Sequence, residues 1–208
     1  MCHITDGSFG GAVTWLCNPA AQASAHFVVA QDGRVVQLVS IEDTAWCNGT
    51  SDLVSNSAYY GHSTLSTVVA RKVNANKYTI SIEHEGAYLT THGVLTVKQL
   101  ATTIDLIAFI RAEVKRIYGV IIPLDRAHIV GHYQITPINK PNCPGAGFQF
   151  DAIIKTLKDR EMLAPSVTIE MVRKWCADEG LIGLSTKGDE PVTYDVLRWF
   201  AYKLQHLT

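Results

Sequence analysis

The sequence carries little net charge, because 18 Lys and Arg residues nearly balance 19 Asp and Glu residues among 208. Nucleic-acid-binding proteins usually show a basic excess or a basic stripe, so the balance argues against a nucleic-acid partner. No stretch approaches the ~20 apolar residues that span a bilayer. The first residues, MCHITDGSFGG, lack the basic start and apolar core of a signal peptide. We therefore expect no membrane partner and synthesis in the cytoplasm.

Closely spaced cysteine pairs are also missing. The five cysteines are odd in number and far apart, and no Cys-x-x-Cys motif occurs. A disulfide framework is therefore not expected, and the chain should mature in a reducing compartment. An isolated thiolate is nevertheless a good soft metal ligand, so one of these residues could do chemistry. The five are Cys2, Cys17, Cys47, Cys143 and Cys176.

Periodicity and turn signals predict strands and helices in mixed order. Residues 26–39 predict a β-hairpin around Asp32-Gly33. Residues 78–85 alternate like a strand, with Glu83 on the polar side. A capping box at Thr96 and Gln99 begins a helix over 97–118, which Gly119 ends. A strand is expected at 127–132 and a helix at 151–163.

This order predicts an α/β fold, a mixed central β-sheet flanked by helices. Residues 1–162 are long enough for one domain with a sizeable core. Pro165 marks a linker to a small helical appendage, residues 163–208, with short helices expected at 168–179 and 193–206. So short a segment buries little surface alone, so we expect it to dock, bind a partner or self-associate.

Three residues stand out as metal ligands. His3 lies at the start, His132 ends the expected strand AHIVGH, and Cys143 lies in the stiff loop that follows. Two imidazoles and one thiolate suit zinc and leave a fourth position for water. Spacing alone leaves an alternative open, a buried neutral Cys143 beside a strand-end His132. Glu83 is the candidate base, and its alternative is a solvated strand residue.

The motifs together resemble the zinc-dependent N-acetylmuramoyl-L-alanine amidases of the type-2 amidase family, which includes phage lytic enzymes and relatives of peptidoglycan recognition proteins. The resemblance covers about residues 3–160, in the family's order. It lies in the stretches HITDGS (3–8), NPAAQASAHFVVAQDGRVVQLV (18–39), DTAWCNG (43–49), YTISIEHEG (78–86), DRAHIVGHYQITP (125–137) and NCPGAGFQFD (142–151).

The resemblance implies that His3, His132 and Cys143 bind Zn²⁺ and that Glu83 acts on the attacking water. The family usually has a basic residue two positions before its third ligand. Here Asn142 directly precedes Cys143, and Lys140 lies three positions before it, so Lys140 is the candidate for stabilising the oxyanion.

Other positions can also be compared with the family's pattern. His26 resembles a structural histidine rather than a ligand, and Ala25 replaces a tyrosine found in some relatives. Cys47 stands where relatives often have histidine. Only Met1 and Cys2 precede His3, so the first strand is expected to be short or unusually paired.

The implied function is hydrolysis of the amide bond between N-acetylmuramic acid and L-alanine in bacterial peptidoglycan. Without a signal peptide, this suggests a phage endolysin that waits in the host cytoplasm until it reaches the cell wall. The alternatives are a bacterial autolysin or recycling amidase, a non-catalytic peptidoglycan-binding module, and a cysteine hydrolase that uses Cys143 with His132. The segment 163–208 weakly resembles a surface-layer-homology unit, which would bind wall polymer.

Overall fold

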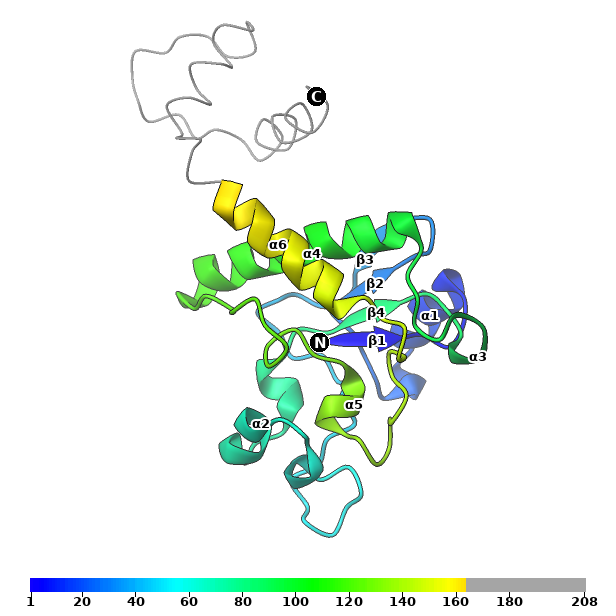
Figure 1. Ribbon diagram of the computed structural model, residues 1–208. Coiled ribbons are helices and arrows are strands. Elements are labelled where there is room, and N and C mark those ends of the chain that lie inside the picture. Colours follow the sequence, from blue (N-terminus) through cyan, green and yellow to red (C-terminus); the bar gives the residue numbers. More distant parts are fainter. Residues whose placement is uncertain (164–208) are drawn as a thin grey trace, which may run out of the picture. The chain divides into compact units, whose positions relative to one another are not determined.

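A four-stranded mixed sheet lies at the centre of the computed structural model, which describes residues 1–163 (Figure 1). The predictions for the C-terminal helices and for the linker at Pro165 lie outside these residues. The strand order is β1-β4-β2-β3, with β1 and β2 parallel to β4 and β3 antiparallel to β2. The predicted mixed sheet with flanking helices is confirmed. The strands are β1 (Cys2–Ile4), β2 (Phe27–Val29), β3 (Val35–Gln37) and β4 (Ile82–His84).

The predicted hairpin is confirmed as β2 and β3. Gly33 adopts a φ of 91° in the turn, a conformation that glycine accepts without strain. The Ala30 N–H donates to the Arg34 carbonyl across the turn at 2.8 Å. Both strands have three residues, so the extended segment is shorter than the predicted 26–39.

The long helix α4 (Val97–Tyr118) has the predicted start and end. Thr96 Oγ1 accepts a hydrogen bond from the Gln99 N–H at 3.1 Å, and Gly119 ends the helix with a φ of 68°. The Gln99 side chain does not complete the capping box. It donates instead to the carbonyls of Val29 and Glu85, at 3.1 and 3.0 Å. Gln99 therefore ties α4 to the sheet.

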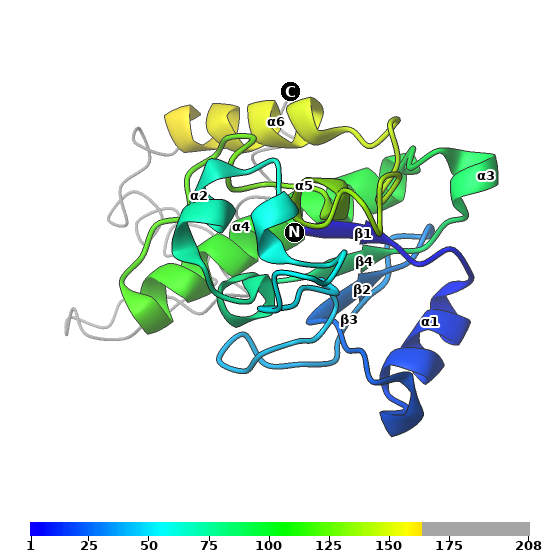
Figure 2. The same cartoon turned by 90° about the horizontal axis from the view of Figure 1, so that it is seen from below.

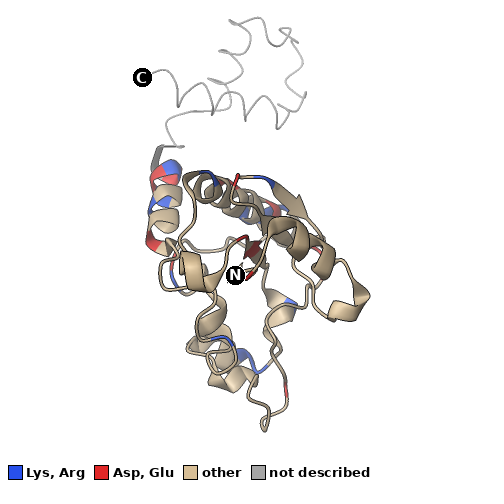
Figure 3. Ribbon diagram, turned by 90° about the vertical axis from the view of Figure 1, so that its right-hand side faces the viewer, with Lys and Arg blue, Asp and Glu red and all other residues tan. Residues whose placement is uncertain are grey.

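Helices α4 and α6 (Phe150–Leu163) supply half of the buried residues of the main core, which covers one face of the sheet (Figures 1 and 2). Exposed positions of α6 carry charges of both signs, among them Asp151, Lys155 and Lys158. Figure 3 shows blue and red segments along this helix. The core residues include Cys2, Phe27, Val29, Ile82, Ile104, Ile107, Ile110, Val114, Phe148, Phe150, Ile153, Ile154 and Leu157.

Short helices fill the connections between the sheet and these two long helices. Within residues 1–163, none of the helices is long and apolar enough to cross a membrane. The α-helices are α1 (Phe9–Leu16), α2 (Ser66–Arg71), α3 (Tyr88–Thr91) and α5 (His132–Ile135). The 3₁₀ helices are η1 (Pro19–Ala21), η2 (Tyr60–His62) and η3 (Ala75–Tyr78).

Two strand predictions need correction. Residues 127–132 form no strand: a turn occupies 126–128, and the only ladder contact is one parallel bridge between Gly131 and Cys2. The Asp125 side chain accepts from the N–H groups of Ala127 and His128, which folds the chain into this turn instead. The expected strand 78–85 shortens to Ile82–His84: Tyr78 ends η3, and residues 79–81 belong to no helix or strand.

Candidate metal centre

His3 and Glu83 meet because their strands are paired in register. In the parallel pair β1–β4, His3 lies opposite Glu83, so both side chains lie on the same face of the sheet. Their neighbours Cys2 and Ile82 point to the other face and join the core. The His3 Nδ1 atom is 3.8 Å from Glu83 Oε1. The predicted alternation therefore brings the candidate base beside the first candidate ligand.

His132 reaches the same face from a different element. It is the first residue of α5, not the end of a strand as predicted. The Cys2 N–H donates to the Val130 carbonyl at 2.8 Å, which holds this loop along the edge of β1. The Nδ1 atoms of His132 and His3 lie 3.0 Å apart, and both side chains are buried.

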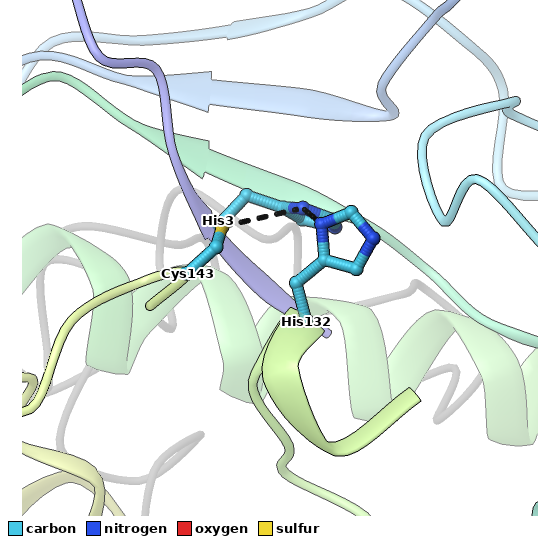
Figure 4. A group of neighbouring side chains, drawn as sticks. All are labelled: His3, His132 and Cys143. Carbon is cyan, nitrogen blue, oxygen red and sulfur yellow. Dashed lines mark hydrogen bonds between the residues drawn. The ribbon is translucent and has the colours of Figure 1, made fainter. Parts of the chain in front are cut away.

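Cys143 completes the group from the loop between α5 and α6 (Figure 4). Its Sγ lies 3.9 Å from His3 Nδ1 and accepts a hydrogen bond from the Ile4 N–H at 3.4 Å. The Tyr133 N–H donates to the Cys143 carbonyl at 2.9 Å, so the loop is fixed to α5. Thus the three predicted ligands converge, with their donor atoms all within 4.8 Å of one another.

The spacing of these three atoms fits a tetrahedral zinc ion. Zn–N bonds of about 2.05 Å and Zn–S bonds of about 2.3 Å place ligand atoms about 3.3 to 3.6 Å apart. The observed separations from His3 Nδ1 are 3.0 Å to His132 and 3.9 Å to Cys143. Glu83 Oε2 is buried beside the group without a hydrogen-bond partner. A buried oxygen of this kind normally has a partner, and a bound ligand would supply one. The residues present therefore fit the metal that the sequence predicts.

Burial shifts the acid–base properties of all four groups toward their neutral forms. It raises the pKa of Cys143 to about 12 and that of Glu83 to about 8, although the Lys140 charge opposes the second shift. It lowers the pKa of His132 to about 4 and that of His3 well below its usual value. Neutral imidazoles are the form that binds a metal, and a cation at this position would favour the thiolate.

The positive charge of Lys140 affects the pKa values of groups in the candidate centre. Its charge lowers the pKa of Glu83 and of Cys143, although burial has the larger and opposite effect on each. The Lys140 N–H donates to the Thr136 carbonyl at 3.0 Å, and its carbonyl accepts from the Cys143 N–H at 3.3 Å. The side chain is exposed, so it could approach a substrate.

His26 has partners of its own, apart from the three candidate ligands. Its Nδ1 accepts from the Ser81 N–H at 3.1 Å, and its Nε2 donates to the Asp43 carbonyl at 3.2 Å. Both ring nitrogens are thus engaged in joining the start of β2 to neighbouring segments. This placement agrees with a structural histidine.

Residues 47 and 48 contact the centre, although the sequence did not indicate how. Cys47 Sγ lies 3.5 Å from His3 Nε2, on the side of the ring away from Cys143. His132 Nε2 donates to the backbone carbonyl of Asn48 at 2.9 Å. The motif DTAWCNG contains both residues, but a contact through a backbone carbonyl leaves no mark on residue type.

Comparison with known proteins places the chain in a family. The family model described as N-acetylmuramoyl-L-alanine amidase, of the type-2 amidases, matches residues 1–146. The N-acetylmuramoyl-L-alanine amidase A of Achromobacter lyticus is 33% identical over 87 residues, which are 41% of this chain and 36% of that protein.

Two solved structures share the fold. AmiD from E. coli, in complex with the substrate anhydro-N-acetylmuramic acid-L-Ala-D-gamma-Glu-L-Lys, superposes with a TM-score of 0.50 at 21% identity, over 74% of this chain and 55% of AmiD. AmpDh3 from Pseudomonas aeruginosa, in complex with anhydromuramic pentapeptide, gives 0.52 at 20% identity, over 74% and 57%.

This chain spans between about a third and three fifths of the length of these relatives. The family match nevertheless runs across the whole sheet and all four groups of the candidate centre, from His3 to Cys143. The chain belongs to the type-2 N-acetylmuramoyl-L-alanine amidase family.

Proposed function

We propose that this protein is a zinc-dependent hydrolase that cuts the amide bond between N-acetylmuramic acid and L-alanine in peptidoglycan. The observation that carries the proposal is the convergence of His3, His132 and Cys143 beside the buried carboxyl group of Glu83. The family match supports the reaction class, and the solved structures of AmiD and AmpDh3 are complexes with muramyl peptides.

The two histidines and the cysteine would hold the zinc ion. When bound, zinc would act as a Lewis acid toward the scissile carbonyl and would lower the pKa of a water molecule. His132 is prepared for this role because Nε2 donates to Asn48, which leaves the lone pair on Nδ1. Cys143 Sγ accepts a hydrogen bond from the Ile4 N–H, and this bond stabilises negative charge on the sulfur.

Glu83 would move the proton. Its free oxygen, Oε2, lies on the face of the sheet that carries His3, so it can accept a proton from water and return it to the leaving nitrogen. Burial raises the pKa of Glu83 to about 8 in the metal-free chain, and the charge of a bound cation would lower it toward the working pH, where a carboxyl group both accepts and returns a proton. Lys140 would stabilise the negative oxygen of the tetrahedral intermediate.

Two rival functions are less well supported. A cysteine hydrolase needs a thiolate, but burial raises the pKa of Cys143 to about 12. Pro144, which follows, has no N–H to offer to an oxyanion. A binding module without a metal does not require a thiol near the histidines, whereas Cys143 Sγ lies 3.9 Å from His3 Nδ1.

The biological setting that we propose is host lysis by a phage endolysin, which stays in the host cytoplasm until it gains access to the wall. The predicted wall-binding or self-associating role of residues 163–208 belongs to the same proposal. A bacterial autolysin or recycling amidase would use the same chemistry. Lysis of bacteria expressing the chain with and without a membrane-perforating protein distinguishes a confined lytic enzyme from one that needs no release.

The decisive test is peptide release from purified peptidoglycan. We expect the released peptides to carry free L-alanine amino termini. Release should stop when zinc is chelated and should resume when one equivalent of zinc is added. An alkylating reagent that stops release while zinc stays bound would favour the cysteine hydrolase. Binding of peptidoglycan without any release, with zinc present, would favour the binding module.

A further inference from the structure

The Nε2 sides of both candidate histidine ligands are contacted by two consecutive residues. His3 Nε2 lies 3.5 Å from Cys47 Sγ, and His132 Nε2 donates to the Asn48 carbonyl at 2.9 Å. On their other sides the two Nδ1 atoms lie 3.0 Å apart, toward Cys143 (Figure 4). The segment 47–48 therefore sits behind both rings and sets which nitrogen of each faces the metal position.

One buried side chain fixes this segment. Asn76, in η3, is 4% exposed, and its Oδ1 accepts from the N–H of Cys47 at 3.3 Å and from the N–H of Asn48 at 2.9 Å. Asn76 is itself held, because its N–H donates to Asn74 Oδ1 at 3.0 Å. A second anchor is the bond from Asn48 Nδ2 to Thr79 Oγ1, at 2.7 Å.

The position of the Asn48 backbone matters because its carbonyl accepts the hydrogen bond from His132 Nε2. An imidazole that donates from Nε2 to a carbonyl keeps its lone pair on Nδ1 and its ring in one orientation. If the segment moves, the acceptor moves with it, and His132 can rotate or change tautomer. Loss of such supporting contacts typically weakens metal binding about 10- to 100-fold.

We propose that Asn76 is a positioning residue for the metal centre: through the backbone of residues 47–48 it fixes the orientation of both histidine ligands and so sets the metal affinity. Asn76 itself contacts neither ligand in the hydrogen bonds described, so it acts only through the segment. The inference rests on the proposed function of His3, His132 and Cys143 as zinc ligands.

The test measures zinc affinity of the full chain by competition with a chromophoric chelator. Asn76→Ala should bind zinc about 10- to 100-fold more weakly than wild type. Asn76→Asp keeps an oxygen that can accept from the same two N–H groups, so its affinity should be restored to within about threefold of wild type. The absorption spectrum of the Co²⁺-substituted protein should be altered in the alanine variant and normal in the aspartate variant.

Gln99→Ala is the matched control, because Gln99 is also a buried amide that bonds two backbone groups. It should lower the stability of the metal-free protein while leaving zinc affinity unchanged. If Asn76→Ala does not fold, Thr79→Val removes the second anchor with little change in volume and should weaken binding about two- to tenfold.

The outcomes separate this inference from the proposed function. If wild type binds no zinc, the proposed metal centre is wrong. If wild type binds zinc and Asn76→Ala, or failing that Thr79→Val, binds it equally well, only the positioning role is wrong. An equal loss of affinity in Gln99→Ala would also overturn it, because general destabilisation would then explain the effect.

Discussion

The two faces of the central sheet are made by the same short strands but follow different rules. On one face Cys2, Ile82 and Phe27 pack against α4 and α6 in an apolar core. On the other face, one residue further along the same strands, His3 and Glu83 stand beside Cys143 and His132. Alternation along three-residue strands therefore places core residues on one face and the His3 and Glu83 side of the candidate metal centre on the other.

The faces differ in what holds their side chains in place. The core face depends on the burial of apolar area, which has no strict direction, so neighbours can shift slightly after a substitution. The site face depends on directed contacts, such as the bond from His132 Nε2 to the Asn48 carbonyl. Substitutions on the core face should therefore change stability, whereas substitutions on the site face should change chemistry and metal binding.

Glu83→Gln should show the largest effect on chemistry. The amide keeps the shape of the side chain but cannot accept a proton, so we expect kcat for peptide release to fall about 10²- to 10⁴-fold. Zinc content and the unfolding temperature should stay close to wild type. Turnover at the wild-type rate would show that another group is the base, and loss of zinc would show that Glu83 helps hold the metal.

Cys143→Ser should separate metal binding from folding. A neutral hydroxyl is a much poorer zinc ligand than a thiolate, so zinc affinity should fall more than about 100-fold and activity should fall with it. Cys17→Ser is the control, because Cys17 is an exposed thiol outside the three-residue group. Metal analysis that finds one zinc per chain in both variants would contradict the ligand set.

The core face was predictable from sequence because its signals are local and periodic. The start of α4 at Thr96, its end at Gly119 and the turn at Gly33 each depend on the conformational preference of a single residue. Residues 127–132 were predicted wrongly because the side chain of Asp125 accepts from the backbone two and three residues ahead and favours a turn.

The site face was only partly predictable. Alternation predicted the side of the strand on which Glu83 lies, and residue chemistry with the family resemblance predicted the three candidate ligands. The parallel pairing of β1 with β4, which sets the distance between His3 and Glu83, is a long-range contact without a local signal. The support from Asn76 was not predicted, because it is also a long-range contact. It is made to backbone N–H groups, which leave no signal in the residue types.

Ile153→Ala tests the core face. Ile153 is fully buried in α6, and its truncation leaves a cavity, so the free energy of unfolding should fall by about 2 to 5 kcal/mol in urea titrations. Zinc affinity at a temperature where the variant is folded should equal that of wild type. Val97→Ala, at an exposed position of the same core helix pair, should change stability by less than about 0.5 kcal/mol. A loss of zinc affinity in Ile153→Ala alone would show that the two faces are coupled.

His26 combines features of the two faces. It is buried like a residue of the core face, but it is held by hydrogen bonds to Ser81 and Asp43, as residues of the site face are. Burial lowers the pKa of His26, with a smaller opposing effect from the Asp43 carbonyl. The unfolded chain therefore binds a proton more readily than the folded protein. The stability that the neutral ring contributes is present above the unfolded pKa of about 6.5 and is lost as the pH falls toward the lowered folded pKa.

Comparison of His26→Gln with wild type isolates this contribution, which should be the smallest of the four effects. Urea unfolding of the metal-free proteins, measured between pH 7.5 and pH 5, removes proton release by metal binding from the comparison. Wild type should lose more stability than the variant over this range, because only wild type must protonate a buried ring as it unfolds in acid. Equal slopes for the two proteins would mean that His26 takes up its proton in the folded state without cost, and that directed bonds alone, not burial, define its role.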